Sequence, residues 1–367
     1  MQGGKAGRSA AASVVLVGGV RLLHPEDQVL AAMLDGWALQ QRSRFLAEST
    51  ITGRRQLVER FHRWSNEYPW RWRPQDLEEW TSDAISERQA AHSTVRGVHV
   101  TLSLFFEYIC DPRYEWAAEC ERRFGTFPTQ ICHEWNTVLH RSEFEGRPGN
   151  RPLTRGELQL LFDHADARVE QVRRLGRKGW LAAFRDATLL KVAYGWGLRR
   201  RELTMLETVD WGRNPKAPEF GGAGSLLVRF GKAKSGGPPR RRSVLSVFGW
   251  AVEVVEEWVS EIRPVYGSSS RVLWPTERDS RVGPVYVNKV FARYRDELGL
   301  PVELGPHCLR HSYVTHLLED GWDPLFVQQQ VGHSWASTTA IYSSVSSDFK
   351  NTVLRQALDE RFGIGGR

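Results

Sequence analysis

The segment at residues 146–152 constrains the fold of this chain more than any other stretch of its sequence. It places two glycines and two prolines within seven residues, a composition that excludes regular helix or strand. A hydrophobic core usually serves roughly 100–200 residues, so a chain of 367 residues has room for two domains. We therefore expect a linker at 146–152, a first domain at 31–145, a second at 153–367, and a flexible N-terminal extension at 1–30.

The pattern of the first domain is helical. Apolar residues recur every three to four positions in two stretches, one around Leu57 and one around Val98. Ser93 is the expected N-cap of the helix that contains Val98. Regular structure should begin near Asp35 and continue to about His140, which predicts an all-helical N-terminal domain.

The second domain combines helices with one small sheet. Thr154 and Glu157 have the spacing of a capping box, which predicts that a helix starts directly after the linker. A further helix is expected over about 181–194, where a Gly-Trp-Gly sequence ends it. Residues 225–230 and 243–247 have strand patterns around a Gly/Pro-rich turn, which predicts a β-hairpin. The expected fold class is mainly α with a small antiparallel β-sheet, preceded by an N-terminal helical domain.

Composition favours some partners and disfavours others. The chain carries 50 Lys and Arg against 43 Asp and Glu, a formal charge of +7 that favours an anionic partner without identifying it. Its four cysteines form no CxxC pair, which fits a reducing compartment such as the cytoplasm. The sequence has no apolar run of roughly 20 residues that could span a membrane, so no membrane partner is expected.

Thiols and imidazoles gather in the later part of the first domain. These side chains could either bind a zinc ion or be ordinary buried residues of the core. The gaps between them match no zinc finger or ribbon spacing, so buried thiols are the expectation. The residues are Cys110, Cys120, Cys132, His133 and His140.

Three short sequence words in the second domain carry residue types that suit phosphodiester chemistry. A phosphodiester under attack gains negative charge on its non-bridging oxygens, and arginine offers fixed donors that stay protonated. The first word, Gly-Leu-Arg-Arg-Arg-Glu-Leu at 197–203, places Arg199 just after a helix-ending turn and Glu202 three positions later. Taken alone, this word fits a basic helix start on a solvated face.

The second word is Gly-Pro-His-Cys-Leu-Arg-His-Ser at 305–312. Pro306 favours a helix start, and on that helix His307 and Arg310 share one face. His307 and His311 also stand at i and i+4, the spacing of a metal site. The glutamate of the HExxH motif is absent and Arg310 would repel a metal ion, so no metal is expected here.

The third word runs from residue 331 to residue 342. Gly332 is expected to end one helix, and a new helix can open a few residues later. Tyr342 then lies late on a short helix, nine residues after His333. Considered alone, a tyrosine in this position is more often a packed aromatic residue.

In this order and at these spacings, the three words resemble the tyrosine recombinase (phage integrase) family. The resemblance covers about residues 150–360, the catalytic domain of that family. The chain departs from the family at Ser344, because the family commonly has a histidine two residues after its nucleophile. That position is not one of the catalytic groups. The three consecutive arginines at 199–201 leave the register of the first word open by one residue.

The resemblance implies a role for each residue of the three words. Arg199 and Arg310 would clamp the scissile phosphate, and His307 would assist them. His333 would hydrogen-bond the same phosphate, and Tyr342 would be the nucleophile. Attack by a tyrosine gives a 3′-phosphotyrosyl link and a free 5′-hydroxyl, which conserves the bond energy for rejoining. The resemblance therefore implies a reaction without ATP, metal or any other cofactor.

The family also carries a lysine in its β-hairpin, which protonates the departing 5′ oxygen. Lys232, in the word Phe-Gly-Lys, fits this role best, and Lys234 is a competitor. The sequence leaves the choice between the two lysines open.

Double-stranded DNA is the partner that the resemblance implies. The helical domain at 31–145 and the catalytic domain would close around the duplex, and a tetramer on two duplexes is the expected assembly. Arginines near expected helix starts and beside the hairpin are candidates for phosphate contacts, although ordinary solvated positions fit the first three as well. They are Arg54, Arg55 and Arg96 in the first domain and Arg240, Arg241 and Arg242 in the second.

A site-specific DNA recombinase for integration, excision or resolution is therefore the expected function. The runner-up is a type IB topoisomerase-like enzyme that relaxes DNA with a related active site, and the hairpin and separate helical domain favour the recombinase over it. A catalytically silent DNA-binding relative is disfavoured because every expected catalytic position is occupied. A metal nuclease is the last alternative.

Overall fold

Two compact units make up the chain in the computed structural model. One spans residues 1–145 with 234–237, and the other spans 146–233 with 238–367. The structure describes residues 24–87, 89–138, 151–176, 179–231, 237–267 and 270–332. Helices dominate both units, and the second contains a small antiparallel sheet, so the predicted fold class is confirmed.

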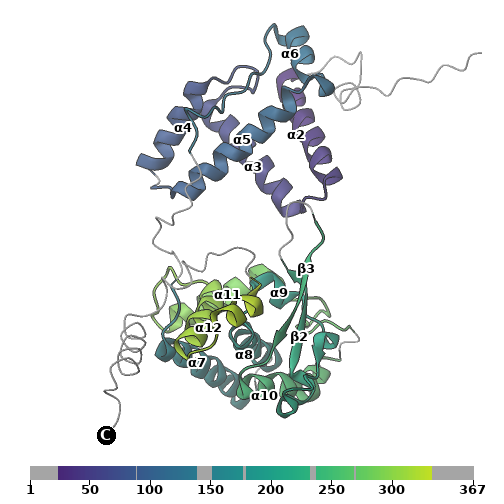
Figure 1. Cartoon of the computed structure of the whole chain (residues 1–367), viewed down its shortest axis with the longest axis vertical. Coiled ribbons are helices and arrows are strands. Elements are labelled where there is room, and N and C mark those ends of the chain that lie inside the picture. The colour runs from purple at the N-terminus through teal and green to yellow at the C-terminus, as the bar shows by residue number, and fades with distance from the viewer. Residues whose placement is uncertain are drawn as a thin grey trace, which may run out of the picture. The chain divides into compact units, whose positions relative to one another are not determined.

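The first unit is built from helices around an aromatic core (Figure 1). Phe61 packs edge-on against Trp72 and Trp80, with ring centroids 4.7 Å and 5.1 Å apart. Each aromatic ring buries a large apolar area, which allows a unit of this size to form a core of its own. The helices are α2 (Pro25–Ser43), α3 (Glu48–Ser65), α4 (Pro74–Ser86), α5 (His92–Ile109), a 3₁₀ turn (Pro112–Tyr114) and α6 (Trp116–Phe124).

The first helix of this unit starts earlier than predicted. α2 begins at Pro25, inside the segment expected to be a flexible extension and before the expected start near Asp35. Proline at the first helical position needs no amide partner, and Glu26 and Asp27 favour the positive end of the helix dipole. These signals for a helix start are strong. They were overlooked because residues 1–30 as a whole show no sustained hydrophobic period.

The predicted N-cap of α5 was wrong. The helix begins at His92, and Ser93 lies inside it. Ala91 is the N-cap, with extended backbone angles of φ −61° and ψ 145°. Its carbonyl accepts hydrogen bonds from the amides of Thr94 and Val95 at 2.8 Å and 3.1 Å, so the first turn is already closed at Ser93.

The second unit opens with the predicted capping box. The Glu157 amide donates to the Thr154 hydroxyl at 3.2 Å, and the Thr154 amide donates to the Glu157 carboxylate at 2.8 Å. The helices are α7 (Arg155–Arg174), α8 (Trp180–Gly195), α9 (Arg200–Thr204), α10 (Gly249–Glu257), α11 (Pro284–Glu297), α12 (His307–Glu319) and α13 (Pro324–Val331). A π-helical turn (Trp258–Ile262) and a 3₁₀ turn (Arg263–Tyr266) continue α10, and two further 3₁₀ turns lie at Thr208–Asp210 and Pro218–Ala223.

The sheet contains the predicted hairpin and one strand more. Its order is β1 (Trp211–Gly212), β2 (Ser225–Gly231) and β3 (Arg240–Leu245), with both pairs antiparallel. The two-residue β1 is too short to leave a pattern in the sequence. β3 starts three residues before the predicted strand at 243, so the three arginines at 240–242 lie in the strand rather than beside it.

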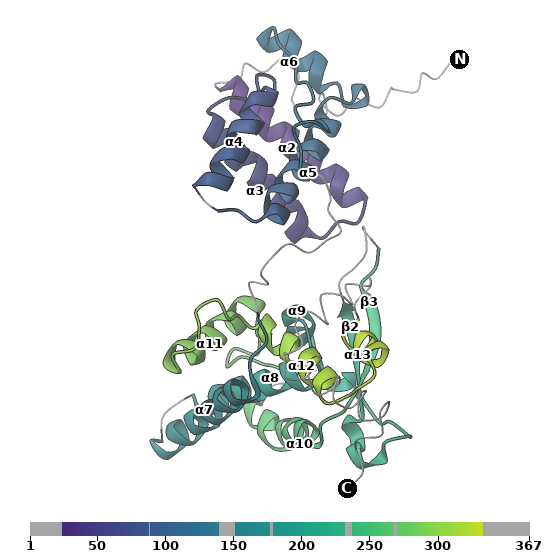
Figure 2. The ribbon, with the colours of Figure 1, turned by 60° about the vertical axis from the view of Figure 1, so that its left-hand side comes forward.

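α8 is the central helix of the second unit. Leu189, Leu190 and Val192 point to different sides of the helix, and all three are buried. A helix that is buried on every side must be surrounded, and α8 packs against α7, α10 and α12 (Figure 1). Figure 2 shows α13 beside β3, which brings the C-terminal end of α13 to the sheet.

Candidate active site

The turn after α8 places Arg199. Gly197 has a left-handed backbone with φ 56°, and a Cβ atom on it would lie 2.5 Å from the Tyr313 ring. Only glycine meets both demands, the unusual angle and the close approach. The neighbouring Leu198 is buried and anchors the turn, so Arg199 follows as the N-cap residue of α9.

A buried carboxylate, that of Glu202, collects three arginines from three separate elements. Arg199, at the start of α9, donates to it from its backbone amide and from Nη1, each at 2.9 Å. Arg242, on β3, donates from Nη1 and Nη2 to the two oxygens, each at 2.8 Å. Nη1 of Arg310, on α12, lies 3.8 Å from Oε2. We call these four residues the arginine cluster.

The arginine cluster holds more positive than negative charge. Burial opposes ionisation of Glu202, but hydrogen bonds and the charge of Arg242, followed by those of Arg199, lower the pKa of Glu202 to about 2. Glu202 is therefore ionised at neutral pH and balances one of the three guanidinium groups. Excess positive charge in a partly desolvated place favours an anionic ligand such as a phosphate.

Arg310 is rigidly held. Its side chain is 2% exposed, and it donates to the Gly197 carbonyl at 2.7 Å and to the Val331 carbonyl. Burial and the charge of Arg199 lower the pKa of Arg310 to about 9, which leaves it protonated at neutral pH. Arg199 is more accessible, with 27% of its side chain exposed.

Both arginines reach the end of α13. Arg199 donates to the carbonyls of Val331 and Gly332 at 3.4 Å and 3.3 Å, and Arg310 donates to Val331 as well. Gly332 is the left-handed C-cap of α13 with φ 63°, as the sequence predicted. The first and second sequence words are thus brought together at the beginning of the third.

His307 opens α12 three residues before Arg310, as predicted from Pro306. Its ring contacts that of His311 edge-on, with centroids 5.0 Å apart. Although His307 is exposed by surface area, partial desolvation and then the charges of His311, Arg310 and other arginines lower its pKa to about 4. His307 is therefore neutral at physiological pH and can accept or donate one hydrogen bond at each ring nitrogen.

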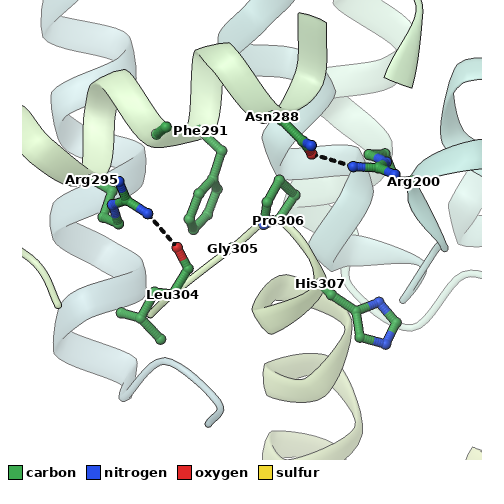
Figure 3. Close-up of a pocket in the computed structure, with 9 residues that line it drawn as sticks. Arg200, Asn288, Phe291, Arg295, Leu304, Gly305, Pro306 and His307 are labelled. Atoms are coloured by element: carbon green, nitrogen blue, oxygen red, sulfur yellow. Dashed lines mark hydrogen bonds between the residues drawn. The ribbon is translucent and has the colours of Figure 1, made fainter. Parts of the chain in front are cut away.

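A pocket of about 480 Å³ lies next to His307 (Figure 3). Arg200, the residue after Arg199, lines it and donates to the Asn288 side chain of α11. On the other side of the pocket, Arg295 donates to the Leu304 carbonyl at 3.0 Å. The pocket therefore lies between Arg200 and Arg295, next to the first residue of α12.

Four of the predicted catalytic residues lie outside the described residues. They are Lys232, Lys234, His333 and Tyr342. The described chain reaches Gly231 at the end of β2, directly before the two lysines, and Gly332 at the end of α13, directly before His333.

The six arginines expected at phosphates have different surroundings. Arg240 and Arg241 are exposed on β3, whereas Arg242 is turned into the arginine cluster. In the first unit, Arg54 donates to Gln41 at 2.9 Å, Arg55 forms ion pairs with Asp35 and Glu59, and Arg96 is half-buried near the start of α5.

Glu202 had no predicted role, and Arg242 was predicted in a role other than a partner of Glu202. Glu202 stood in the first word, three positions after Arg199, and that spacing was the available signal for a carboxylate partner. Arg242 was predicted to contact a DNA phosphate because it lies near the proposed lysine, and its strand was predicted to start one residue later. Its place in the arginine cluster depends on the register of β3.

The thiols are free. Cys120, Cys132 and Cys308 are buried and Cys110 is half-buried, and burial raises the pKa of each thiol. Within the described ranges, His, Cys, Asp and Glu side chains form no group of three or more that could hold a metal ion. In the same part of the chain, no helix is both long and apolar enough to cross a membrane.

Comparison with known sequences agrees with the geometry. The model of the phage integrase family matches residues 168–348, a range that contains every catalytic residue predicted above. The tyrosine recombinase XerC of Bradyrhizobium diazoefficiens is 34% identical over 198 residues, 54% of this chain and 56% of that protein. XerC of Escherichia coli O1:K1 is 32% identical over 169 residues, 46% of this chain and 51% of that protein. The chain spans about half the length of the curated relatives that it matches.

Solved structures share the fold. XerH recombinase bound to a palindromic difH substrate, in a post-cleavage complex, aligns with a TM-score of 0.60 at 19% identity, over 91% of this chain and 84% of that one. A lambda integrase dimer bound to a COC′ core site aligns with a TM-score of 0.55 at 16% identity, over 90% of this chain and 83% of that one. At these identities the likeness establishes the fold alone.

Proposed function

We propose that this chain, whose residues 168–348 belong to the phage integrase family, is a site-specific recombinase that cuts and rejoins duplex DNA through a 3′-phosphotyrosyl intermediate. The observation that carries the proposal is the arginine cluster. Arg199 and Arg310 come from words more than 100 residues apart, yet both contact the end of α13. Two guanidinium groups converging on one place suit the two non-bridging oxygens of a phosphodiester.

The cluster also supports a nucleophile of high pKa. A tyrosine hydroxyl has an ordinary pKa of about 10 and attacks phosphorus only where cations favour its phenolate. In the proposed reaction the Tyr342 oxygen bonds to phosphorus, and the bond to the 5′ oxygen of the leaving strand breaks. Lys232 or Lys234 gives that oxygen its proton. Reversal of the same steps rejoins a strand, with no net oxidation and no nucleotide consumed.

His307 fits a supporting role in this reaction. Because its pKa is lowered to about 4, the ring is neutral when the reaction starts, with one nitrogen able to accept and the other able to donate. A neutral imidazole three residues before Arg310 can accept a proton from Tyr342 or donate a hydrogen bond to a phosphate oxygen. The proposal gives His333 a hydrogen bond to that phosphate.

The proposed partner is duplex DNA, and the proposed assembly is a tetramer on two duplexes in the cytoplasm. The relatives are named tyrosine recombinases, and two of the structural neighbours are complexes with DNA sites. We assign the helical domain at 31–145 to DNA binding beside the catalytic domain, with Arg54, Arg55, Arg96, Arg240 and Arg241 as candidate phosphate contacts. Integration, excision and resolution are all compatible with this chemistry.

The test begins with a DNA site. Wild-type protein selects duplexes from a random-sequence library, and the strongest binder, made with a nick near the cleavage position, is the selected duplex. After incubation in EDTA and denaturation, we expect a covalent protein–DNA adduct from the wild type and none from Tyr342→Phe. Exchange of strands between two un-nicked selected duplexes identifies a recombinase, whereas relaxation of a supercoiled plasmid alone identifies a topoisomerase. No adduct, or an adduct that requires magnesium, would contradict the proposal.

A further inference from the structure

We infer that Arg242 is a positioning residue, which holds the phosphate-binding arginines and the β2–β3 hairpin in one arrangement, and that it does not contact DNA. The inference rests on the proposed recombinase function. It replaces the phosphate contact that was predicted for Arg242 together with Arg240 and Arg241.

Each of the three guanidinium nitrogens of Arg242 donates a hydrogen bond within the protein. Nη1 and Nη2 donate to the two carboxylate oxygens of Glu202 at 2.8 Å each, a bidentate pair, and Nε donates to the Gln330 carbonyl at 2.8 Å. Its side chain is 13% exposed. A guanidinium with its fork on a buried carboxylate would have to give up those bonds to offer the same fork to a DNA phosphate. Arg240 and Arg241, exposed on the same strand, have no such obstacle.

The hydrogen bond from Arg242 to the Gln330 carbonyl connects β3 to α13, and the Gln330 side chain forms a second connection close by. The Gln330 side chain donates to the Leu245 carbonyl at 2.7 Å and accepts from the Leu245 amide at 2.9 Å. The Gln330 side-chain amide therefore forms the same two hydrogen bonds with the Leu245 backbone that a neighbouring strand would form. Gln330 is buried, so losing either bond would leave a polar group without water to replace the partner.

Close packing against the cap of α13 completes the connection. A Cβ atom on Gly332 would lie 2.9 Å from Cδ of Arg242, so the glycine makes room for the arginine stem. The Val331 carbonyl accepts from Arg199 and Arg310, and the Gly332 carbonyl accepts from Arg199. The last turn of α13 therefore contacts both the strand and the arginine pair.

Three parts of the proposed reaction meet at Arg242 as a result. Lys232 and Lys234 lie in the sequence between the end of β2 and the start of β3, and α13 ends directly before His333. The third part is the pair Arg199 and Arg310, oriented through Glu202. Without Arg242, the buried carboxylate loses its bidentate partner and attracts Arg310, now 3.8 Å away, in competition with a phosphate.

The experiment uses the full-length protein and the selected duplex. It compares Arg242→Gln, Arg242→Lys and the matched control Arg213→Gln, which removes an exposed arginine directly after β1. Three quantities are measured: the single-turnover rate of adduct formation at saturating DNA, the dissociation constant, and its dependence on salt concentration. Thermal unfolding confirms that each variant is folded.

We expect Arg242→Gln to lower the saturating rate about 100-fold, as for loss of an oriented charge donor. Its dissociation constant for the selected duplex should stay within about threefold of the wild-type value. The salt slope, which is the slope of log Kd against log salt concentration, should be unchanged because no phosphate contact is lost. Arg242→Lys, which keeps the charge and one hydrogen bond, should recover part of the rate. Arg213→Gln should keep the saturating rate, because Arg213 is exposed and lies outside the arginine cluster. The inference is overturned if Arg242→Gln keeps the saturating rate and loses affinity and salt dependence instead.

A measurement without DNA separates this inference from the proposed function. The carboxyl ¹³C signal of Glu202 is titrated in the wild type and in Arg242→Lys and Arg242→Gln. The pKa of Glu202 should rise in Arg242→Gln, because Arg242 is its main favourable partner. If the wild type forms no adduct, the recombinase function fails, and a raised pKa still supports the arrangement at Glu202. An unchanged pKa overturns the inference whatever the adduct assay shows.

Discussion

Arginine and carboxylate meet in both units of this molecule, with different consequences. In the first unit, Arg55 pairs with Asp35 and Glu59, whose side chains are 61% and 40% exposed. In the second unit, three arginines share Glu202, whose side chain is 1% exposed. Solvent screens the charges of the first unit's ion pairs, and the charge of Arg55 is balanced by its two carboxylate partners. The arginine cluster is desolvated and keeps unbalanced positive charge, which is what a site for a phosphate requires.

The largest expected difference between the two regions is in stability. Glu202→Gln removes the charge that three guanidinium groups share, and breaking a buried ion pair in this way costs about 3 kcal/mol. Glu59→Gln, the matched change in the first unit, should cost less than about 1 kcal/mol because its pair is exposed. Urea unfolding of both variants measures the two free energies. Equal losses would show that the arginine cluster is no more dependent on its carboxylate than a surface pair.

The rate of adduct formation should also respond differently to changes in the two units. Arg310→Lys keeps the charge but cannot donate to Gly197, Val331 and a phosphate together, so the saturating rate of adduct formation should fall about 100-fold. Arg55→Lys, at the exposed pair of the first unit, should leave this rate unchanged. A full rate in Arg310→Lys would mean that charge alone, without the fork, is enough at this position.

The pH dependence of His307 offers a third contrast. Its folded pKa of about 4 lies below the ordinary unfolded value of about 6.5, so the unfolded chain binds the proton more readily. The stability that comes from keeping His307 neutral is therefore complete above pH 6.5 and is lost as pH falls toward 4. His307→Gln should flatten the decline in stability across that window.

The cause of this shift can be tested directly. Imidazole NMR of Arg199→Gln should show a higher pKa for His307, since one of the positive charges that lower it has gone. A wild-type pKa near 6.5 for His307 would contradict the electrostatic description of the site.

The smallest expected effect is at Arg55 itself. Arg55→Gln breaks exposed ion pairs, so stability should change by less than about 1 kcal/mol. If Arg55 also contacts a DNA phosphate, the salt slope of binding should fall by about 1 while the saturating rate of adduct formation stays constant. Loss of that rate would place Arg55 closer to the chemistry than its surroundings suggest.

Local signals were the ones that could be predicted from the sequence. The capping box at Thr154, the glycine that ends α13, and the start of α12 after Pro306 each depend on a few neighbouring residues, and the structure has all three. Arg199, His307 and Arg310 were predicted as catalytic residues because their words are short and ordered, and this role stays a prediction. The structure adds that both arginines contact the carbonyls at the end of α13.

Contacts that depend on the register of the strands could not be predicted from the sequence. Arg242 and Glu202 are 40 residues apart in the chain, and successive side chains of a strand point to opposite faces. A shift of one residue in β3 would have turned Arg241 inward in place of Arg242. The pairing of β2 with β3 decides this, because Val228 lies opposite Arg242 and a bulge follows before Gly231.

One measurement tests the central claim, that Arg199 and Arg310 neutralise the charge of the scissile phosphate. The selected duplex is made with a methylphosphonate at the scissile position, which removes the negative charge, and adduct rates are compared for wild type and Arg199→Ala. On the ordinary phosphate we expect Arg199→Ala to lose about 100-fold or more in rate. On the neutral methylphosphonate that loss should shrink to about tenfold or less, because there is less charge to neutralise. An equal loss on both substrates would contradict the account, since Arg199 would then act on something other than the phosphate charge.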